Sequence, residues 1–292
     1  MIIVVIAAVL LVAVLAVFAI SYFESQKLNM TFYKIAATEE EKAKKEKQGI
    51  RFVVLADLHN HQFGKENEIL LKKIREVAPD FVVSAGDILT ARPGHDVDVA
   101  LYLMEQLAKE YPVYYGNGNH EQRLFLYPEN YPGAYEKYDT GLKQCGVRRL
   151  INETIKVEMK GHKIAITGLE LERKYYKRFQ NVEMDVEALE KMIGKKTQEY
   201  TILIAHNPEY FDVYADWGAD LILSGHVHGG MVRLPFLGGV ISPKGRLFPK
   251  YDAGAYYKKK SCMLLSRGLG MHTIPVRLWN RPEVLVVDLQ FE

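Results

Sequence analysis

Along much of this chain of 292 residues, short apolar runs alternate with stretches in which apolar residues recur at the spacing of a helix. The runs at residues 50–56, 80–85 and 112–117 are rich in Val, Leu, Phe and Tyr, a composition typical of buried strands. Between them, residues 66–77 and 97–109 repeat apolar side chains at helical spacing. Because a strand–helix–strand order needs crossover connections, it predicts parallel strands in one sheet.

A second group of strands is predicted later in the chain. The buried-strand pattern returns at residues 199–205 and 220–224, with a helix expected near residues 208–215 between them. Alternating runs flank Lys160-Gly161 and predict a hairpin. The expected fold class is α/β, with two mixed β-sheets packed as a sandwich, flanking helices in a four-layer arrangement, and one N-terminal transmembrane helix.

The N-terminus carries a long uncharged stretch. Residues 2–20 contain no charged side chain, and as a helix they span roughly 28 Å, close to the ~30 Å hydrocarbon core of a bilayer. We therefore expect a transmembrane anchor at residues 1–23. A cleaved signal peptide is the alternative, because Val17-Phe18-Ala19 offers the small residues of a cleavage site. No Lys or Arg precedes the apolar run, however, which disfavours this alternative.

The rest of the chain divides by composition. Residues 24–49 combine a juxtamembrane strand with the charged segment TEEEKAKKEKQG, which predicts a short solvated helix. Residues 50–292 are expected to form one large domain with a sizeable core. Cys145 and Cys262 lie far apart and could pair only if folding brings them together. The net charge of +2 provides no general attraction for nucleic acid, so no nucleic-acid partner is expected.

Polar side chains follow the end of each predicted buried strand. In chain order these are Asp57 and His59, then Asp87, then Asn119 with His120 and Glu121, then His206, and finally His226 with His228. If the strands are parallel, their ends share one rim of the sheet, where ligand sites of α/β proteins gather. Two aspartates, four of the histidines and one asparagine supply oxygen and nitrogen ligands for divalent cations. These ligands are too many for one catalytic zinc but suit two ions that share a carboxylate.

Together these residues form an ordered set of short motifs. The set is D-x-H at Asp57, G-D at Asp87, G-N-H-E at Asn119, H at His206 and G-H-x-H at His226. It resembles the motif set of the calcineurin-like metallophosphoesterases over roughly Arg51 to Arg281, which identifies residues 50–292 as a metallophosphoesterase domain. The stretches GHVHGGMVRLPFLGG, SRGLG and NRPEVLVVDL resemble the bacterial membrane-associated branch of that family. That branch includes enzymes acting on phosphodiesters and on lipid-linked sugar nucleotides.

The resemblance implies a role for each residue. The first metal is expected to bind Asp57, His59 and His228. The second metal is expected to bind Asn119, His206 and His226, with Asp87 bridging the two ions. His120 is expected to stay outside the metal shells, where it donates to the leaving oxygen, and Glu121 is expected to orient it. Structural alternatives are a helix cap at Asp57, a turn at Asp87, a loop contact at Asn119 and a helix start at His206.

The implied function is hydrolysis of a phosphate ester by in-line attack of a metal-bridging hydroxide, with two divalent ions (Mn, Zn or Fe) as cofactors. A phosphodiester or pyrophosphate substrate is favoured, with a lipid-linked substrate as a further option. A phosphomonoesterase or phosphoprotein phosphatase, and a non-catalytic metal-binding scaffold, are the alternatives. Lys27 and Lys34 favour a cytoplasmic domain. The resemblance to anchored enzymes implies an extracytoplasmic domain at the membrane instead, which is the expectation adopted.

Besides His120, four histidines lie outside the metal set. His61 is close enough in sequence to the site to touch substrate, although a surface role is favoured, and His95 lies in a predicted loop. His162 and His272 are expected to be exposed to solvent.

One aromatic and basic stretch and two arginines are further candidates. The stretch RKYYKRF at residues 173–179 is expected to be a solvated insertion, with contact to an acyl chain or lipid headgroup as the alternative. Arg233 and Arg267 follow predicted site segments and could meet a substrate phosphate, because the guanidinium fork suits phosphate.

Overall fold

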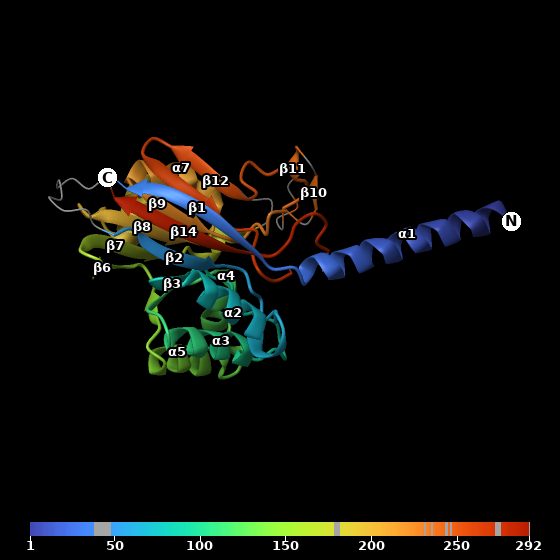
Figure 1. The fold of residues 1–292 in the computed structure, drawn as a ribbon, viewed down its shortest axis with the longest axis horizontal. Coiled ribbons are helices and arrows are strands. Elements are labelled where there is room, and N and C mark those ends of the chain that lie inside the picture. Colours follow the sequence, from blue (N-terminus) through green and yellow to red (C-terminus); the bar gives the residue numbers. More distant parts are fainter. Residues whose placement is uncertain are drawn as a thin grey trace.

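The computed structural model describes residues 1–37, 48–177, 182–230, 232–234, 236–242, 245, 247–271 and 276–291. Most of the charged segment with its expected helix lies outside these residues, as do His272 and the end of the RKYYKRF stretch. The described chain consists of a projecting helix, α1 (Ile2–Ser25), and a body of two packed sheets with helices on the outside (Figure 1).

The first sheet has six strands in the order β1-β14-β2-β3-β4-β5. Their bounds are Asn29–Ala37 (β1), Glu283–Phe291 (β14), Ile50–Leu55 (β2), Phe81–Ser84 (β3), Val113–Gly116 (β4) and Arg148–Leu150 (β5). Strands β2 to β5 are parallel, β14 is antiparallel to β2, and β1 is parallel to β14. β1 therefore has the opposite direction to β2, although the two strands are not neighbours. As a result, the chain that leaves α1 enters the sheet at the rim where β2, β3 and β4 end.

The second sheet also has six strands, in the order β12-β13-β9-β8-β7-β6. Their bounds are Gly254–Lys258 (β12), Ser261–Leu265 (β13), Leu221–Ser224 (β9), Tyr200–Ala205 (β8), His162–Leu169 (β7) and Glu153–Met159 (β6). The four central strands are parallel, and both edge strands are antiparallel to their neighbours. The predicted hairpin is confirmed between β6 and β7, where Lys160 and Gly161 have φ of 52° and 82°. Positive φ at both turn residues matches the twist of the strands.

The central strands are buried on both faces, and their side chains alternate between two cores. In β2, Phe52 and Val54 pack between the sheets with residues of β8 such as Ile202. Val53 and Leu55 point the other way and pack against the helices of the first sheet. A strand covered on both sides needs apolar residues at every position, which explains the continuous apolar runs in the sequence.

Helices cover the outer face of each sheet. α2 (Glu68–Val77), α3 (Asp98–Ala108) and α5 (Ala134–Gln144) lie on the first sheet, and α6 (Val186–Ile193) and α7 (Phe211–Trp217) lie on the second (Figure 1). The shorter elements are α4 (Asn119–Leu126), β10 (Arg233–Leu234), β11 (Gly238–Gly239) and the 3₁₀ turns η1 (Lys65–Asn67), η2 (Pro128–Asn130), η3 (Arg173–Tyr176) and η4 (Pro208–Tyr210). The predicted class, two mixed sheets between helical layers, is confirmed.

Helix α1 is exposed along its length but fixed at its last turn. The backbone N–H of Arg277 donates to Ser21 Oγ at 2.7 Å, and the Arg281 guanidinium pairs with the Glu24 carboxylate at 3.1 Å. Within the described residues, α1 is the helix that is long and apolar enough to cross a membrane. Its length and composition suit a membrane span or a signal sequence.

Candidate metal centre

The predicted ligands meet at one rim of the sandwich, which we call the metal rim. Strands β2 and β3 of the first sheet and β8 and β9 of the second end there, and each is followed by one or more of these side chains. Asp57, His59 and His228 form one group whose ligand atoms lie within 4.8 Å of one another, and Asp87, His206 and His226 form another. A third such group contains His59, Asp87 and His120, and the division of these ligands between two ions stays a prediction.

In the first group, nitrogen and oxygen atoms converge on one point. His59 Nε2 lies 3.1 Å from His228 Nε2, and the two rings stack with an interplanar angle of 13°. His228 Nε2 lies 3.5 Å from Asp57 Oδ1. Two imidazole nitrogens and one carboxylate oxygen in this arrangement are a suitable ligand set for a divalent cation.

The second group is oriented by the backbone of the first sheet. The Nδ1–H of His206 donates to the carbonyl oxygen of Ala85 at 2.7 Å, which directs Nε2 at Asp87 Oδ2, 3.2 Å away. A histidine ligand is commonly fixed in this way by a carbonyl acceptor. The same Asp87 oxygen lies 3.9 Å from His59 Nε2, so it faces both groups.

Asn119 offers a further oxygen atom that a cation could bind. Its Oδ1 is buried and has no hydrogen-bond partner among the described residues. Asn119 is the first residue of α4, and the N–H of the next residue, His120, donates to Asp87 Oδ1 at 2.7 Å. Because a buried carbonyl oxygen without a partner is costly, a bound cation would explain the position of this side chain.

The backbone at the metal rim is held in an unusual conformation. Positive φ values between 50° and 74° occur at Asp57, His59, Asp87, His226 and His228. Residues other than glycine avoid this left-handed region at a cost of roughly 1–3 kcal/mol each, and such strain clusters at functional sites. Neighbouring glycines are needed for space, since a Cβ on Gly118 would overlap the Asp87 carboxylate and one on Gly225 would overlap Asp57.

Burial and mutual charge shift the pKa values of this cluster. Burial raises the pKa of Asp57 to about 7, with Asp87 adding to the rise and His206 opposing it. Burial would also raise the pKa of Asp87, but His206, His120 and His59 outweigh it and hold that pKa well below its usual range. For His206 burial acts downward, yet Asp87 and Asp57 raise its pKa to about 10. The cluster thus requires positive charge, which a metal ion can supply in place of protons.

His120 faces the same carboxylate but is oriented as a proton donor. Its Nδ1 accepts the backbone N–H of Ala91 at 2.9 Å, so the neutral ring carries its proton on Nε2. Nε2 lies 4.0 Å from Asp87 Oδ2. A protonated ring nitrogen has no lone pair for a metal, so this geometry favours donation by His120 over ligation.

The carboxylate of Glu121, which was expected to orient His120, is directed at the loop that carries Asp87. Glu121 is buried, and its carboxylate accepts backbone N–H groups of Asp87, Ile88 and Gly118, each at 2.9 Å. It also accepts the Tyr115 hydroxyl at 2.6 Å. The group that meets Nδ1 of His120 is the Ala91 amide instead. Glu121 therefore positions the loop that carries Asp87.

Two residues at the rim were missed by sequence reasoning. The ring of Tyr176 lies edge-on to the ring of His226, with centroids 5.1 Å apart. Asn280 Nδ2 donates to the carbonyl oxygens of His228 and Gly230 at 2.7 and 2.6 Å. The RKYYKRF stretch contained the signal for Tyr176, but the expectation of a solvated insertion is wrong for its tyrosines. Tyr175 is 5% exposed and packs in the core of the second sheet.

Other candidates lie apart from the ligands. His162, expected to be exposed, is 0% exposed and stacks on Phe291 with ring centroids 3.7 Å apart. His61 is partly buried, and burial lowers its pKa to about 4. Arg233 is engaged by the Gly229 carbonyl and by Asp252 at 3.0 Å. Cys145 and Cys262 are free thiols, so no disulfide joins them.

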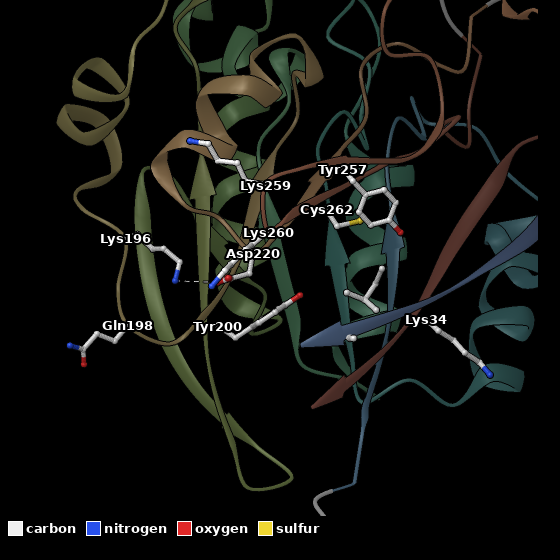
Figure 2. Close-up of a pocket in the computed structure, with 11 residues that line it drawn as sticks. Lys34, Lys196, Gln198, Tyr200, Asp220, Tyr257, Lys259, Lys260 and Cys262 are labelled. Carbon is white, nitrogen blue, oxygen red and sulfur yellow. Dashed lines mark ion pairs between the residues drawn. The ribbon is translucent and has the colours of Figure 1, made fainter. Parts of the chain in front are cut away.

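The described chain also contains a cleft of about 600 Å³ at the opposite end of the strands. Lys34, Lys196, Lys259 and Lys260 line it together with Tyr200 and Asp220 (Figure 2). Tyr200 begins β8 and Asp220 precedes β9, whereas the metal-rim residues follow the ends of these strands. We call this end the far rim. The cleft is therefore separate from the metal cluster.

Comparison with known proteins agrees with this geometry. The sequence pattern of the calcineurin-like phosphoesterases matches residues 50–230, more than half of the chain. YpbG of Bacillus subtilis (strain 168) is 27% identical over 249 residues, covering 84% of this chain and 83% of that protein. The phosphodiesterase YaeI of Escherichia coli (strain K12) is 25% identical over 243 residues, covering 82% of each.

A relative that matches over a shorter stretch has a name that states its substrate. The UDP-2,3-diacylglucosamine pyrophosphatase LpxG of Chlamydia muridarum is 28% identical over 97 residues, covering 31% of this chain and 29% of that protein. The family match covers both ligand groups and His120. The chain therefore belongs to the calcineurin-like phosphoesterase family, whose members hydrolyse phosphate esters with a dinuclear metal centre.

Proposed function

We propose that this chain is a membrane-anchored phosphodiesterase that cleaves a phosphodiester or pyrophosphate bond of a lipid-linked substrate. The observation that carries the proposal is the position of Asp87 Oδ2, which lies 3.2 Å from His206 Nε2 and 3.9 Å from His59 Nε2. One carboxylate oxygen faces both histidine groups, as a bridging ligand in a two-metal site requires.

The ligand assignment follows from the two groups. We assign the first ion to Asp57, His59 and His228, and the second to Asn119, His206 and His226, with Asp87 shared. When bound, two such ions supply positive charge to the phosphate oxygens and ionise water near neutral pH. The mixed set of imidazole nitrogens and carboxylate or amide oxygens suits Mn, Zn or Fe.

His120 is proposed to protonate the leaving oxygen. The Ala91 N–H keeps the proton of the neutral ring on Nε2, and the backbone N–H of His120 itself is fixed by Asp87. Its side chain is 13% exposed, which leaves a route for solvent to return the proton after each turnover. General acids of this kind typically contribute about 10²–10⁴-fold to a rate.

Two kinds of support favour a lipid-linked substrate with a phosphodiester or pyrophosphate bond. YaeI is named a phosphodiesterase and LpxG a pyrophosphatase of a diacylated sugar nucleotide. In addition, β1 pairs in register with β14 from Asn29 and Glu283 onward, beside the end of β2 that leads to Asp57. The C-terminal end of α1 and the metal cluster therefore lie at the same rim of the sandwich (Figure 1).

We propose that α1 is retained as an anchor. The uncharged run at residues 2–20 exceeds the apolar region of a typical signal peptide, which is about 7–15 residues long. We place the catalytic domain outside the cytoplasm, as the resemblance to anchored bacterial enzymes implies. Fractionation of spheroplasts tests the anchor, because a retained α1 keeps the protein with the membrane. Protease added to the spheroplasts tests the side, because it degrades an external domain and leaves a cytoplasmic domain intact.

The activity is tested with the full chain in detergent micelles, loaded in turn with Mn, Zn or Fe. We expect turnover of bis-p-nitrophenyl phosphate to exceed that of p-nitrophenyl phosphate with at least one metal. The reverse preference would identify a phosphomonoesterase or phosphoprotein phosphatase. A protein that binds two ions but hydrolyses neither ester would be a metal-binding scaffold.

A further inference from the structure

An apolar surface is exposed beside the metal rim. It consists of Leu234, Phe236, Leu237, Leu247, Phe248 and Trp279, and we call it the rim surface. Phe236 is fully exposed, and the exposed fractions of Phe248 and Trp279 are 58% and 64%. Water-soluble surfaces seldom present so many large apolar side chains together, and such a cluster marks a surface that contacts a partner or a membrane.

Backbone pairings between three short segments hold the parts of the rim surface together. Leu234 ends β10, and Phe236 and Leu237 lie in the turn before β11. Just after β11, the Val240 carbonyl accepts the N–H of Phe248 at 2.8 Å. The residue before β10 pairs with Leu278, the neighbour of Trp279, so Trp279 lies beside this hairpin.

Residues 276–281, which include Trp279, bind both α1 and the loop that carries His228. The N–H of Arg277 binds Ser21 Oγ, and Arg281 pairs with Glu24. Asn280 Nδ2 donates to the carbonyl of His228. Figure 1 shows β10 and β11 at the end of the body from which α1 projects. The apolar surface, the end of the proposed anchor and the metal cluster are thus fixed relative to one another.

We infer that the rim surface inserts into the same bilayer that α1 spans, at the boundary between headgroups and acyl chains. Trp and Tyr favour this boundary, and apolar side chains of interfacial elements reach roughly 5–10 Å into it. Tyr22 and Phe23, in the last turns of α1, are 63% and 64% exposed and provide aromatic side chains at the helix end. The bilayer is preferred over a second protein because α1 already brings a membrane to this face.

The insertion has a consequence for substrate access. With the rim surface in the boundary, the metal cluster opens at headgroup depth, so a lipid phosphate reaches it while its acyl chains stay in the bilayer. This consequence rests on the proposed function, whereas the insertion itself rests only on the rim surface and the anchor.

The two tryptophans of the chain allow a direct test. Trp279 belongs to the rim surface, whereas Trp217 is 6% exposed and donates to the Gly194 carbonyl inside the body. The full chain is reconstituted into phosphatidylcholine vesicles with plain or dibrominated acyl chains, and tryptophan emission is compared. We expect the brominated lipid to quench the Trp279 part of the emission and to leave the emission of a Trp279→Phe variant unchanged. Equal emission in the two lipids would overturn the inference, as would a dimer in vesicles that leaves Trp279 unquenched.

Charge substitutions separate insertion from chemistry. Phe236→Asp and Phe248→Asp should reduce the quenching of Trp279 and lower turnover of a vesicle-embedded diacyl phosphodiester by about tenfold or more, the loss expected when one aromatic ring is no longer buried. Turnover of bis-p-nitrophenyl phosphate should not change. Tyr257→Asp is the matched control, because Tyr257 is 72% exposed at the far rim (Figure 2).

The outcomes distinguish the two proposals. Hydrolysis of the soluble diester without any quenching of Trp279 would overturn the insertion and leave the proposed function standing. Quenching with no hydrolysis of any ester would support the insertion and refute the proposed function. An equal loss of vesicle activity in Tyr257→Asp would show that the effect is not specific to the rim surface, and would count against the insertion.

Discussion

The two ends of the β-sandwich hold their charged groups in opposite physical states. At the metal rim, Asp57 and Asp87 are 0% and 2% exposed and face histidines in a closed cluster. At the far rim, Lys196 pairs with Asp220 at 3.2 Å and Lys259 with Asp216 at 2.7 Å, with both lysines partly or largely in solvent. The cleft at the far rim is lined by solvated ion pairs, whereas the charged groups of the metal rim are buried.

This difference shows that the presence of a cleft does not by itself locate the chemistry. Buried carboxylates are costly unless cations neutralise them, so their persistence at the metal rim calls for a ligand. Left-handed backbone at five of the cluster residues adds conformational strain, and strain of this kind is typical of functional sites. Exposed ion pairs, in contrast, contribute only about 0–1 kcal/mol and need no ligand to explain them.

The largest expected effect comes from removing the shared carboxylate. Asp87→Asn should lower diester hydrolysis on the order of a thousandfold and reduce the bound metal, because Asp87 Oδ2 faces both histidine groups. Initial rates and metal analysis by mass spectrometry measure the two effects. Asp220→Asn is the control at the far rim and should retain activity and metal. Full metal occupancy in Asp87→Asn would contradict the bridging role.

Next in size is the loss of the proposed proton donor. His120→Asn should lower turnover by about 10²–10⁴-fold while the metal content stays that of the parent protein, because the ring is oriented to donate and not to ligate. His95→Asn, at an exposed histidine that belongs to none of the candidate ligand groups, is the control and should be as active as the parent. If His120→Asn loses metal in proportion to activity, His120 is a ligand and the donor assignment is wrong.

Much of the fold and the composition of the candidate site could be read from the sequence. Strands buried on both faces, such as β2 and β8, need unbroken apolar runs, and these runs are visible without coordinates. Parallel strands end at one rim, so polar residues after separate strands were expected to meet, and the structure brings them together. Their roles as ligands stay predictions until a metal is measured.

What could not be predicted depends on contacts between distant segments. Glu121 binds three backbone N–H groups, two of which belong to the Asp87 loop, and no spacing in the sequence indicates that loop. His162 is buried because β7 lies near the C-terminal strand that carries Phe291. The sequence likewise does not indicate the positive φ at Asp57 or His59, because most aspartates and histidines lie outside the left-handed region.

A smaller effect is expected in the pH dependence of stability at the metal rim. Without metal, the pKa of Asp57 is raised from the ordinary aspartate value of 3.8 to about 7. The stability that Asp57 contributes is therefore present below pH 3.8 and is lost as the pH rises through about 7. The pKa of His206 is raised to about 10, so its contribution is full below 6.5 and is lost as pH rises through about 10. Asp87, with a lowered pKa, contributes above 3.8 and loses that contribution in acid.

The metal-free protein should therefore have a Tm that falls as pH rises from near neutral into the alkaline range. Metal replaces the lost protons, so added Mn should raise Tm more at alkaline than at acidic pH. Thermal unfolding of the full chain in detergent, with chelator or with Mn, measures both slopes. Parallel pH profiles in the two conditions would show that the cluster does not exchange protons for metal.

The smallest effect is expected at the far rim. Lys259 pairs with Asp216 at 2.7 Å, but its side chain is 63% exposed, so water screens the pair and competes for both groups. Lys259→Ala should change the free energy of unfolding by less than about 1 kcal/mol and leave diester turnover unaltered. Chemical denaturation and initial rates measure these quantities. A loss of activity comparable to that of His120→Asn would mean that the lysine-lined cleft communicates with the metal rim through the sheets, and the contrast between the two ends would no longer separate structure from chemistry.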